Sequence, residues 1–174
     1  MNEVKIVMFG DYGIGKSACS IRFYRDFFVV EYDTTIQDNF TKQIEINGES
    51  YIINILDTAG AEDISPYLPF YAEGGGGFII GYSITSRCSF DNVSVFYNVI
   101  KKVKGDDYPA IIIIGNKCDL TFERQVSYEE GQELAELLNC GFYETSAKEK
   151  INIDEVFHDI AVKAKPDERT VIEK

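Results

Sequence analysis

The chain has 174 residues, of which 45% are apolar, and it carries a formal net charge of −12. This length and apolar content suit one domain with a single sizeable core rather than two small ones. The acidic balance argues against nucleic acid, and against an anionic membrane, as a partner of the domain surface.

The first predicted strand, Lys5–Phe9, leads directly into a glycine-rich loop from Gly10 to Ser17. This loop matches the pattern G-x-x-x-x-G-K-[ST], in which glycines let successive backbone N–H groups turn inward around a β-phosphate. Lys16 would reach the β- and γ-phosphate oxygens, and Ser17 would offer a hydroxyl to Mg²⁺ at the start of a predicted helix, Lys16–Arg25. The pattern predicts a nucleotide-phosphate site, and the plainer interpretation is a glycine-rich turn into a helix.

The next two predicted strands, Asn39–Ile46 and Tyr51–Asp57, flank an Asn47-Gly48 dipeptide. Asn-Gly is a hairpin-turn signal, so these strands should be antiparallel neighbours. Asp57 closes the second strand and opens the motif Asp-Thr-Ala-Gly, at a sheet edge where this class of fold places ligand-contacting loops. A carboxylate at this place can hold Mg²⁺ through water.

The segment that follows combines a helix start with helix breakers. Ser65-Pro66 fits an N-cap followed by proline at the first helical position, but Pro69 lacks the N–H that would bond back along the helix. We therefore expect a short or irregular helix. The four glycines at 74–77 have two interpretations: a hinge with unusual freedom, or close packing at a strand entrance.

Strand-like and helix-like runs alternate through the rest of the chain, which is typical of βα units around a largely parallel sheet. Two helices should begin with capping boxes, one at Ser127 with Glu130 and one at Asn152 with Glu155. The predicted strands are Phe78–Ile84, Ala110–Gly115 and Gly141–Glu144, and the predicted helices are Ser89–Val103, Tyr128–Leu138 and Ile153–Lys163.

Two further motifs follow predicted strands and point to the base. In Asn116-Lys117-Cys118-Asp119, the Asp119 carboxylate can accept hydrogen bonds from the ring N–H and the amino group of guanine. Adenine offers no such pair of donors, so this carboxylate favours GTP over ATP. In Glu144-Thr145-Ser146-Ala147-Lys148, the backbone N–H of Ala147 could reach the guanine carbonyl oxygen.

Together, these motifs resemble the Ras family of small GTPases, from about Val4 to Lys163, with features similar to the Ras, Rap and Rheb branches. The resemblance implies an α/β fold of the P-loop NTPase (small G-protein) class. Its sheet would have six strands, mostly parallel with one antiparallel edge hairpin, flanked by about five helices. It also implies a monomer made of a single G domain at 1–166 and a short C-terminal tail at 167–174.

The resemblance further implies residue roles. Residues 31–40 look like the first switch loop, where Thr35 would bind Mg²⁺ and the γ-phosphate while Phe28 packs on guanine. Mg²⁺ would be held by Ser17, Thr35 and Asp57, and catalysis would involve Lys16, Thr35, Gly60 and Ala61. The implied GTP- and GDP-binding residues are Gly10, Asp11, Tyr12, Gly13, Ile14, Gly15, Lys16, Ser17, Ala18, Phe28, Val29, Tyr32, Thr35, Ala59, Gly60, Asn116, Lys117, Asp119, Ser146, Ala147 and Lys148.

The expected partners also come from the resemblance. Effector proteins would bind residues 31–40, and an exchange factor and an activating protein would bind the 57–75 region. The four cysteines have no metal spacing and there is no apolar run of membrane-spanning length, so we expect a cytosolic protein without disulfides. The last residues hold no C-a-a-X box, so membrane association would require a lipidated tail beyond this sequence.

Two departures from the family pattern concern hydrolysis. Ala61 stands where the family usually has a glutamine that orients water, either as a natural difference or as an introduced change that traps GTP. Tyr12 stands where glycine is usual, and its ring would either lean over the γ-phosphate or point to solvent. We therefore expect a molecular switch in signalling with slow or impaired hydrolysis, the alternative being a hydrolysis-deficient pseudo-GTPase binding module. A small-molecule kinase or ATPase is disfavoured by Asp119.

Overall fold

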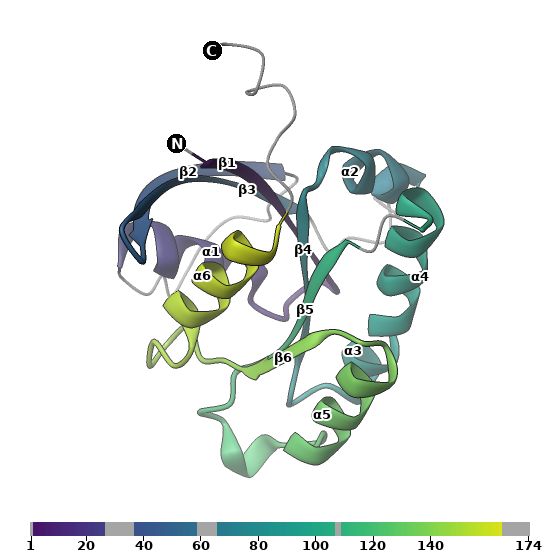
Figure 1. Cartoon of the computed structure of the whole chain (residues 1–174). Helices are drawn as coiled ribbons and strands as arrows, with labels where there is room; N and C mark the ends of the chain where they lie inside the picture. Colours follow the sequence, from purple (N-terminus) through teal and green to yellow (C-terminus); the bar gives the residue numbers. More distant parts are fainter. Residues whose placement is uncertain (1, 27–36, 59–65, 107–108, 165–174) are drawn as a thin grey trace, which may run out of the picture.

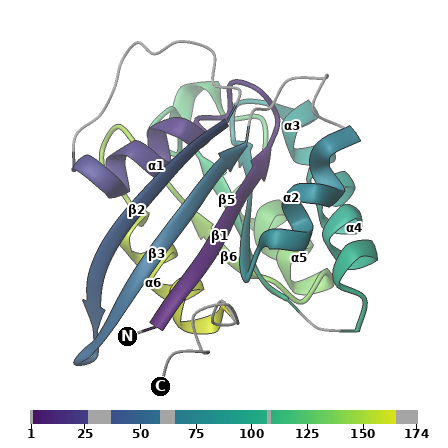
Figure 2. The ribbon, with the colours of Figure 1, turned by 90° about the horizontal axis from the view of Figure 1, so that it is seen from above.

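The computed structural model describes residues 2–26, 37–58, 66–106 and 109–164. Within them, a six-stranded sheet in the order β2-β3-β1-β4-β5-β6 forms the middle layer (Figure 1). Neighbouring strands are parallel except β2 and β3, and Figure 2 shows β1 and β3 pointing the same way. The strands are β1 (Asn2–Gly10), β2 (Gln37–Ile46), β3 (Glu49–Thr58), β4 (Gly77–Ser83), β5 (Ala110–Asn116) and β6 (Gly141–Glu144).

The β2–β3 hairpin forms where the sequence predicts it. Asn47 and Gly48 both have positive φ, 53° and 82°, as a two-residue primed turn requires. The register pairs Ile46 with Glu49 and Phe40 with Ile55. The predicted fold class, with one antiparallel edge hairpin, is confirmed.

Helices cover both faces of the sheet because the central strands are apolar on both faces. In β1, Ile6 and Met8 pack on one side while Val7 and Phe9 pack on the other, as expected for a buried parallel strand. One face is covered by α1 (Lys16–Arg25) and α6 (Ile153–Lys163), and the other by α2 (Leu68–Gly74), α3 (Arg87–Asp91), α4 (Val93–Lys104) and α5 (Tyr128–Leu137).

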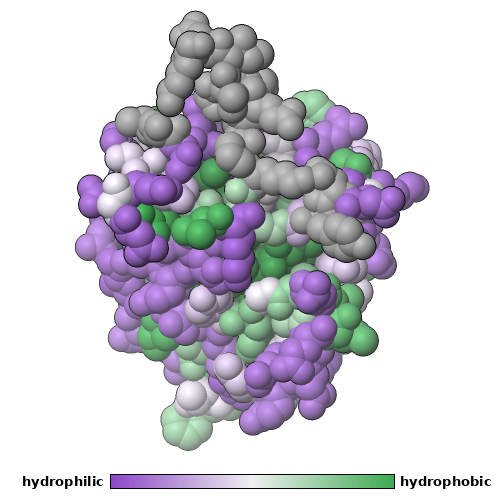
Figure 3. All heavy atoms as spheres, viewed as in Figure 1, coloured by the Kyte–Doolittle hydropathy of each residue, from purple (hydrophilic) through white to green (hydrophobic). Residues whose placement is uncertain are grey.

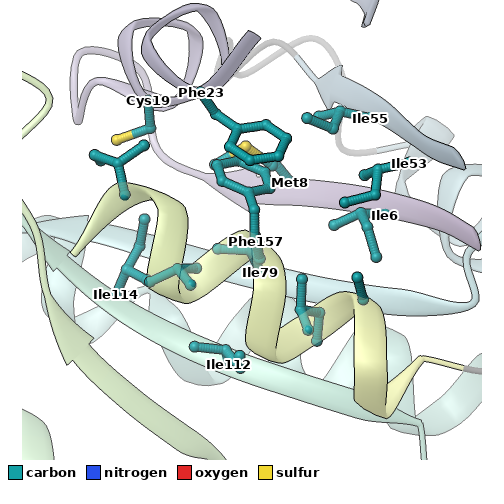
Figure 4. Close-up of a cluster of buried hydrophobic side chains, with 14 of the residues drawn as sticks. Ile6, Met8, Cys19, Phe23, Ile53, Ile55, Ile79, Ile112, Ile114 and Phe157 are labelled. Atoms are coloured by element: carbon teal, nitrogen blue, oxygen red, sulfur yellow. The ribbon is translucent and has the colours of Figure 1, made fainter. Parts of the chain in front are cut away.

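Aromatic rings stack in the core on both faces of the sheet. Phe23 of α1 and Phe157 of α6 stack with ring centroids 4.3 Å apart, in the same buried cluster as Met8 and Ile79 (Figure 4). On the opposite face, Phe9 stacks against Phe78 and Phe96 with centroids 6.2 and 5.9 Å away. Figure 3 shows one face of the molecule, largely hydrophilic, with apolar side chains gathered in its middle.

One predicted helix is wrong. The sequence predicts a continuous helix over Ser89–Val103, whereas the structure has α3 and α4 separated at Asn92. The first helix begins earlier because the Ser86 hydroxyl accepts the N–H of Ser89 as an N-cap. At the break, the N–H of Val95 bonds to the carbonyl of Asn92 at 3.0 Å, a tighter i to i+3 turn that apolar periodicity does not reveal.

One of the two predicted capping boxes is confirmed and the other is wrong. Ser127 and Glu130 make both reciprocal bonds at the start of α5. Asn152 is instead left-handed, with φ 56°, and its side-chain amide donates to the Glu144 carbonyl at 2.9 Å. It therefore ties β6 to α6 and does not cap the helix with its side chain.

Close packing accounts for Gly75 and Gly77 in the four-glycine run at 74–77. Gly75 has an ordinary extended conformation, with φ −83°, and a Cβ there would lie 2.5 Å from the Phe78 ring. A Cβ at Gly77 would lie 3.0 Å from the Ala164 methyl carbon. The short α2 before them fits the expected short helix, with Pro69 in its first turn.

No helix among the described residues is long and apolar enough to cross a membrane.

Tyr82 explains why two other positions are glycine. Its side chain is fully buried, and a Cβ at Gly115 would lie 2.7 Å from its hydroxyl oxygen. A Cβ at Gly131 in α5 would meet the same hydroxyl and would lie 2.5 Å from the Phe142 ring. Burial raises the pKa of the Tyr82 phenol, so the group stays neutral.

Gly131→Ala should lower the free energy of unfolding although alanine is the better helix former. The added methyl overpacks two rings at a cost of about 1–3 kcal/mol, against a helical gain of about 1 kcal/mol. Urea unfolding measures the difference, with the exposed neighbour Gln132→Ala as the control. A more stable Gly131→Ala protein would contradict this packing account.

Candidate functional site

The predicted motifs meet at the carboxyl ends of the parallel strands. The phosphate loop follows β1, Asp57 lies near the end of β3, and Asn116 ends β5. The loop after β6 joins them, because the N–H of Thr145 donates to the Gly115 carbonyl at 2.8 Å and the N–H of Cys118 donates to the Thr145 carbonyl at 3.0 Å. Parallel pairing therefore gathers segments more than a hundred residues apart at one edge.

Close contacts and backbone conformation fix glycine at two places in the phosphate loop. Gly15 has φ 94°, and a Cβ there would collide with the side-chain amide of Asn116. A Cβ at Gly10 would lie 2.5 Å from the Gly81 carbonyl oxygen. Ile14, buried between these positions, would likewise collide with a side chain at Gly81.

Lys16 is held inside the loop. The residue is only 5% exposed, and its ammonium donates to the carbonyls of Gly10 and Asp11 at 2.9 and 3.0 Å. Burial lowers the pKa of Lys16 to about 8, while the negative charges of Asp57 and Asp11 oppose that shift. The loop thus holds one buried cation in a fixed position.

Ser17 and Asp57 come together from α1 and β3. The Ser17 hydroxyl donates to the Asp57 carboxylate, and both residues are buried. The Asp57 strand is fixed next to the phosphate loop because the Thr58 hydroxyl donates to the Met8 carbonyl at 2.6 Å. A hydroxyl and a carboxylate are hard oxygen donors of the kind Mg²⁺ prefers, so these residues fit the predicted metal.

Asn116 connects the phosphate loop to the loop after β6. It is 2% exposed, and its side-chain amide donates to the Ile14 carbonyl at 2.8 Å. Its amide oxygen accepts from the Thr145 hydroxyl at 3.1 Å. Lys117, left-handed with φ 64°, adds a second link by donating to the Gly13 carbonyl at 2.7 Å.

Asp119 is oriented by the loop after β6. The Ser146 hydroxyl donates to its carboxylate at 2.7 Å, and the same hydroxyl accepts from the N–H of Glu149 at 3.0 Å. Asp119 is half-buried, Ala147 is buried, and Lys148 is exposed. The carboxylate therefore has a fixed direction near the surface of the site.

The remaining predicted site residues fall into two groups. Ala18 is buried in the core on the α1 face, and Tyr12 is 69% exposed. Phe28, Val29, Tyr32, Thr35, Ala59, Gly60 and Ala61 lie outside the described residues.

Sequence reasoning missed several groups that support the site. The Thr145 hydroxyl holds Asn116, and the Arg124–Glu144 ion pair, at 2.5 Å, holds the segment before the β6 loop. Asn92 donates to the phosphate-loop residue Asp11. Motif spacing could not indicate this last contact, because the two residues are 81 positions apart.

Asn116→Ala should lower the free energy of unfolding by about 2–4 kcal/mol, because it leaves the Ile14 carbonyl and the Thr145 hydroxyl without their buried partner. Urea unfolding in one buffer measures the loss. Asn98→Ala, at an exposed position of α4, is the matched control and should change little. Equal stability of the two variants would show that the Asn116 hydrogen bonds between the loops do not contribute to the free energy of unfolding.

Comparisons with known proteins agree with this arrangement. The sequence model of the Ras family matches residues 5–166. Ras-like protein 1 of Saccharomyces cerevisiae is 49% identical over 160 residues, which cover 92% of this chain and 52% of the yeast protein. The chain thus spans about half the length of this curated relative. The phosphate loop, the β5 and β6 motifs and the family match together show that the chain belongs to the Ras family.

Proposed function

We propose that this chain is a guanine-nucleotide-dependent switch whose G domain, residues 1–166, binds GTP and GDP with Mg²⁺. One observation carries the proposal. The carboxylate that would select guanine belongs to Asp119, in the loop after β5. Two other residues at this place, Asn116 and Lys117, make hydrogen bonds directly to the phosphate loop. A nucleotide that spans both loops would have its base and phosphates held by one connected unit.

Base selection would come from Asp119. The Ser146 hydroxyl donates to one carboxylate oxygen, which fixes the orientation of the group toward a ligand. Guanine presents two N–H donors to such an acceptor, whereas adenine would place its own ring acceptor against the negative charge. Ala147, buried beside this loop, would direct its backbone N–H at the guanine carbonyl oxygen.

Phosphate binding would use the Lys16 ammonium and the N–H groups of the loop at the start of α1. Ser17 and Asp57 would hold Mg²⁺, with Thr35 joining in the GTP form. When bound, Mg²⁺ supplies positive charge that offsets the β- and γ-phosphate oxygens. Thr35 and Gly60 would contact the γ-phosphate, and these contacts would be lost on hydrolysis. Residues 31–40 would therefore bind effector proteins only in the GTP form.

Hydrolysis should be slow. Ala61 offers only a methyl group where a water-orienting amide would act, and phosphoryl transfer depends on positioning. Tyr12 is a residue of the phosphate loop and is 69% exposed, and its ring would occupy space that a partner's arginine needs. An exchange factor and an activating protein would bind the 57–75 region. Membrane association would need a lipidated tail beyond this sequence.

Asp119→Asn should weaken GTP and GDP alike by about 2–5 kcal/mol, because it replaces a charged acceptor with an amide. Competition of GDP and ADP against a fluorescent guanine nucleotide measures both affinity and base preference. Glu133→Gln, which removes one exposed charge from α5, is the control. Unchanged guanine affinity in Asp119→Asn would refute the assignment of the base site.

Ala61→Gln with Tyr12→Gly should restore intrinsic and stimulated GTP hydrolysis, and each single change should restore less, because both residues serve one transition state. An arginine finger raises the hydrolysis rate by roughly 10³–10⁵-fold, and an activating protein should give the unchanged chain little of this increase. Single-turnover hydrolysis, with and without an activating protein, measures both effects. No gain in the double variant would favour the pseudo-GTPase module.

A further inference from the structure

A single side-chain hydrogen bond joins the phosphate loop to the junction between α3 and α4. The amide nitrogen of Asn92 donates to a carboxylate oxygen of Asp11 at 2.7 Å. Asp11 is the second residue of the phosphate loop and is half-buried. The bond therefore connects the loop that would hold the nucleotide to a helical layer on one face of the sheet.

The Asn92 end of this bond is firmly placed by the core. Val93, the next residue, is fully buried, and Ser89 in the preceding turn accepts the N–H of Ser83 on β4 at 3.0 Å. The backbone N–H of Asn92 donates to the Cys88 carbonyl at 3.1 Å, and its carbonyl accepts from Val95 at 3.0 Å. Asn92 is thus fixed independently of the phosphate loop and can serve as an anchor.

The side chain of Asn92 does not serve its own helix. Asparagine before a helix commonly caps it with the side-chain oxygen. Asn92 precedes α4 but makes no such cap bond; its amide nitrogen donates to Asp11 at 2.7 Å and makes a weaker contact to the Cys88 sulfur at 4.0 Å. The amide is therefore committed to the phosphate loop.

The Asp11 end matters because it is a negative charge in an anion-binding loop. The backbone carbonyl of Asp11 accepts from the Lys16 ammonium at 3.0 Å, and the negative charge of the Asp11 side chain also acts on that ammonium, where it opposes the lowering of the Lys16 pKa by burial. Among the described residues, the carboxylates whose negative charge acts on Lys16 are Asp57 and Asp11. A carboxylate that turned toward Lys16 would compete with the phosphates for it and would repel them.

We propose that Asn92 is a positioning residue for nucleotide binding: it holds the Asp11 carboxylate at the α3–α4 junction, away from the phosphates. This inference rests on the proposed binding of guanine nucleotides. Loss of the bond frees the carboxylate to approach Lys16, so the affinity for GDP and GTP falls through charge and not through unfolding.

The test compares the release rates and affinities of fluorescent GDP and GTP in four proteins. Asn92→Ala should bind both nucleotides about tenfold more weakly than the parent chain, the effect of one uncompensated charge nearby. Asp11→Asn combined with Asn92→Ala should recover at least parental affinity, because the charge that repels the phosphates is gone. Asn98→Ala, the same change at an exposed position of α4, should leave affinity unchanged.

The outcomes separate the possible failures. If Asn92→Ala weakens binding and Asp11→Asn does not rescue it, Asn92 serves only the helix junction and the proposal is wrong. If Asn92→Ala binds as tightly as the parent, the proposal is also wrong. If the parent chain itself binds no guanine nucleotide, it is the proposed function that fails.

A second pair keeps the test decisive if Asn92→Ala does not fold. Asn92→Asp keeps the side-chain size but opposes two carboxylates, and it should weaken nucleotide binding. Adding Asp11→Asn reverses donor and acceptor, restores the bond and should restore affinity. Urea unfolding of all variants checks that the folded fraction is the same. A reciprocal pair no better than Asn92→Asp alone would overturn the proposal.

Discussion

The hydrogen bonds of Asn116 are the interaction on which the rest of the site depends. One buried amide bonds at the same time to the phosphate loop after β1 and to the loop after β6, through Ile14 and Thr145. Together with the Lys117 bond to Gly13, it joins the loop that carries Lys16 to the loop that carries Asp119. Fixed placement of ligand-binding groups lowers the ordering cost of binding.

The sheet makes this connection possible. Parallel neighbours β1, β4, β5 and β6 end at the same edge, so their loops meet without long connections. Packing on β4 also constrains the phosphate loop. Ile14 fits because Gly81 has no side chain, and the Gly10 backbone lies close to the Gly81 carbonyl. Asn92 would add a constraint from the side, through the charge of Asp11. The phosphate loop is thus contacted by Asn116, Gly81 and Asn92, which come from three different parts of the fold.

Local signals predicted much of this architecture. The bounds of α1, β6 and α6 follow from apolar periodicity, and the Asn47-Gly48 turn follows from the positive φ that both residues accept. Three features were not predictable. The break at Asn92 is a local i to i+3 turn that apolar periodicity does not reveal. The left-handed Asn152 accompanies a side-chain bond to the Glu144 carbonyl, and glycine alone does not distinguish a hinge from the packing seen at Gly75. The roles of Thr35, Gly60 and Ala61 stay predictions, since these residues lie outside the described ranges.

The most direct test of the central claim is the identity of the nucleotide that purifies with the protein. Denaturing the protein and separating the released nucleotides by anion-exchange chromatography reports base and phosphate number together. A site in which Asp119 and Lys16 are held in one unit, with Ala61 slowing hydrolysis, predicts GTP in nearly equal amount to protein. Adenine nucleotides, or no nucleotide at all, would contradict the account, whereas GDP alone would uphold the base site and refute slow hydrolysis.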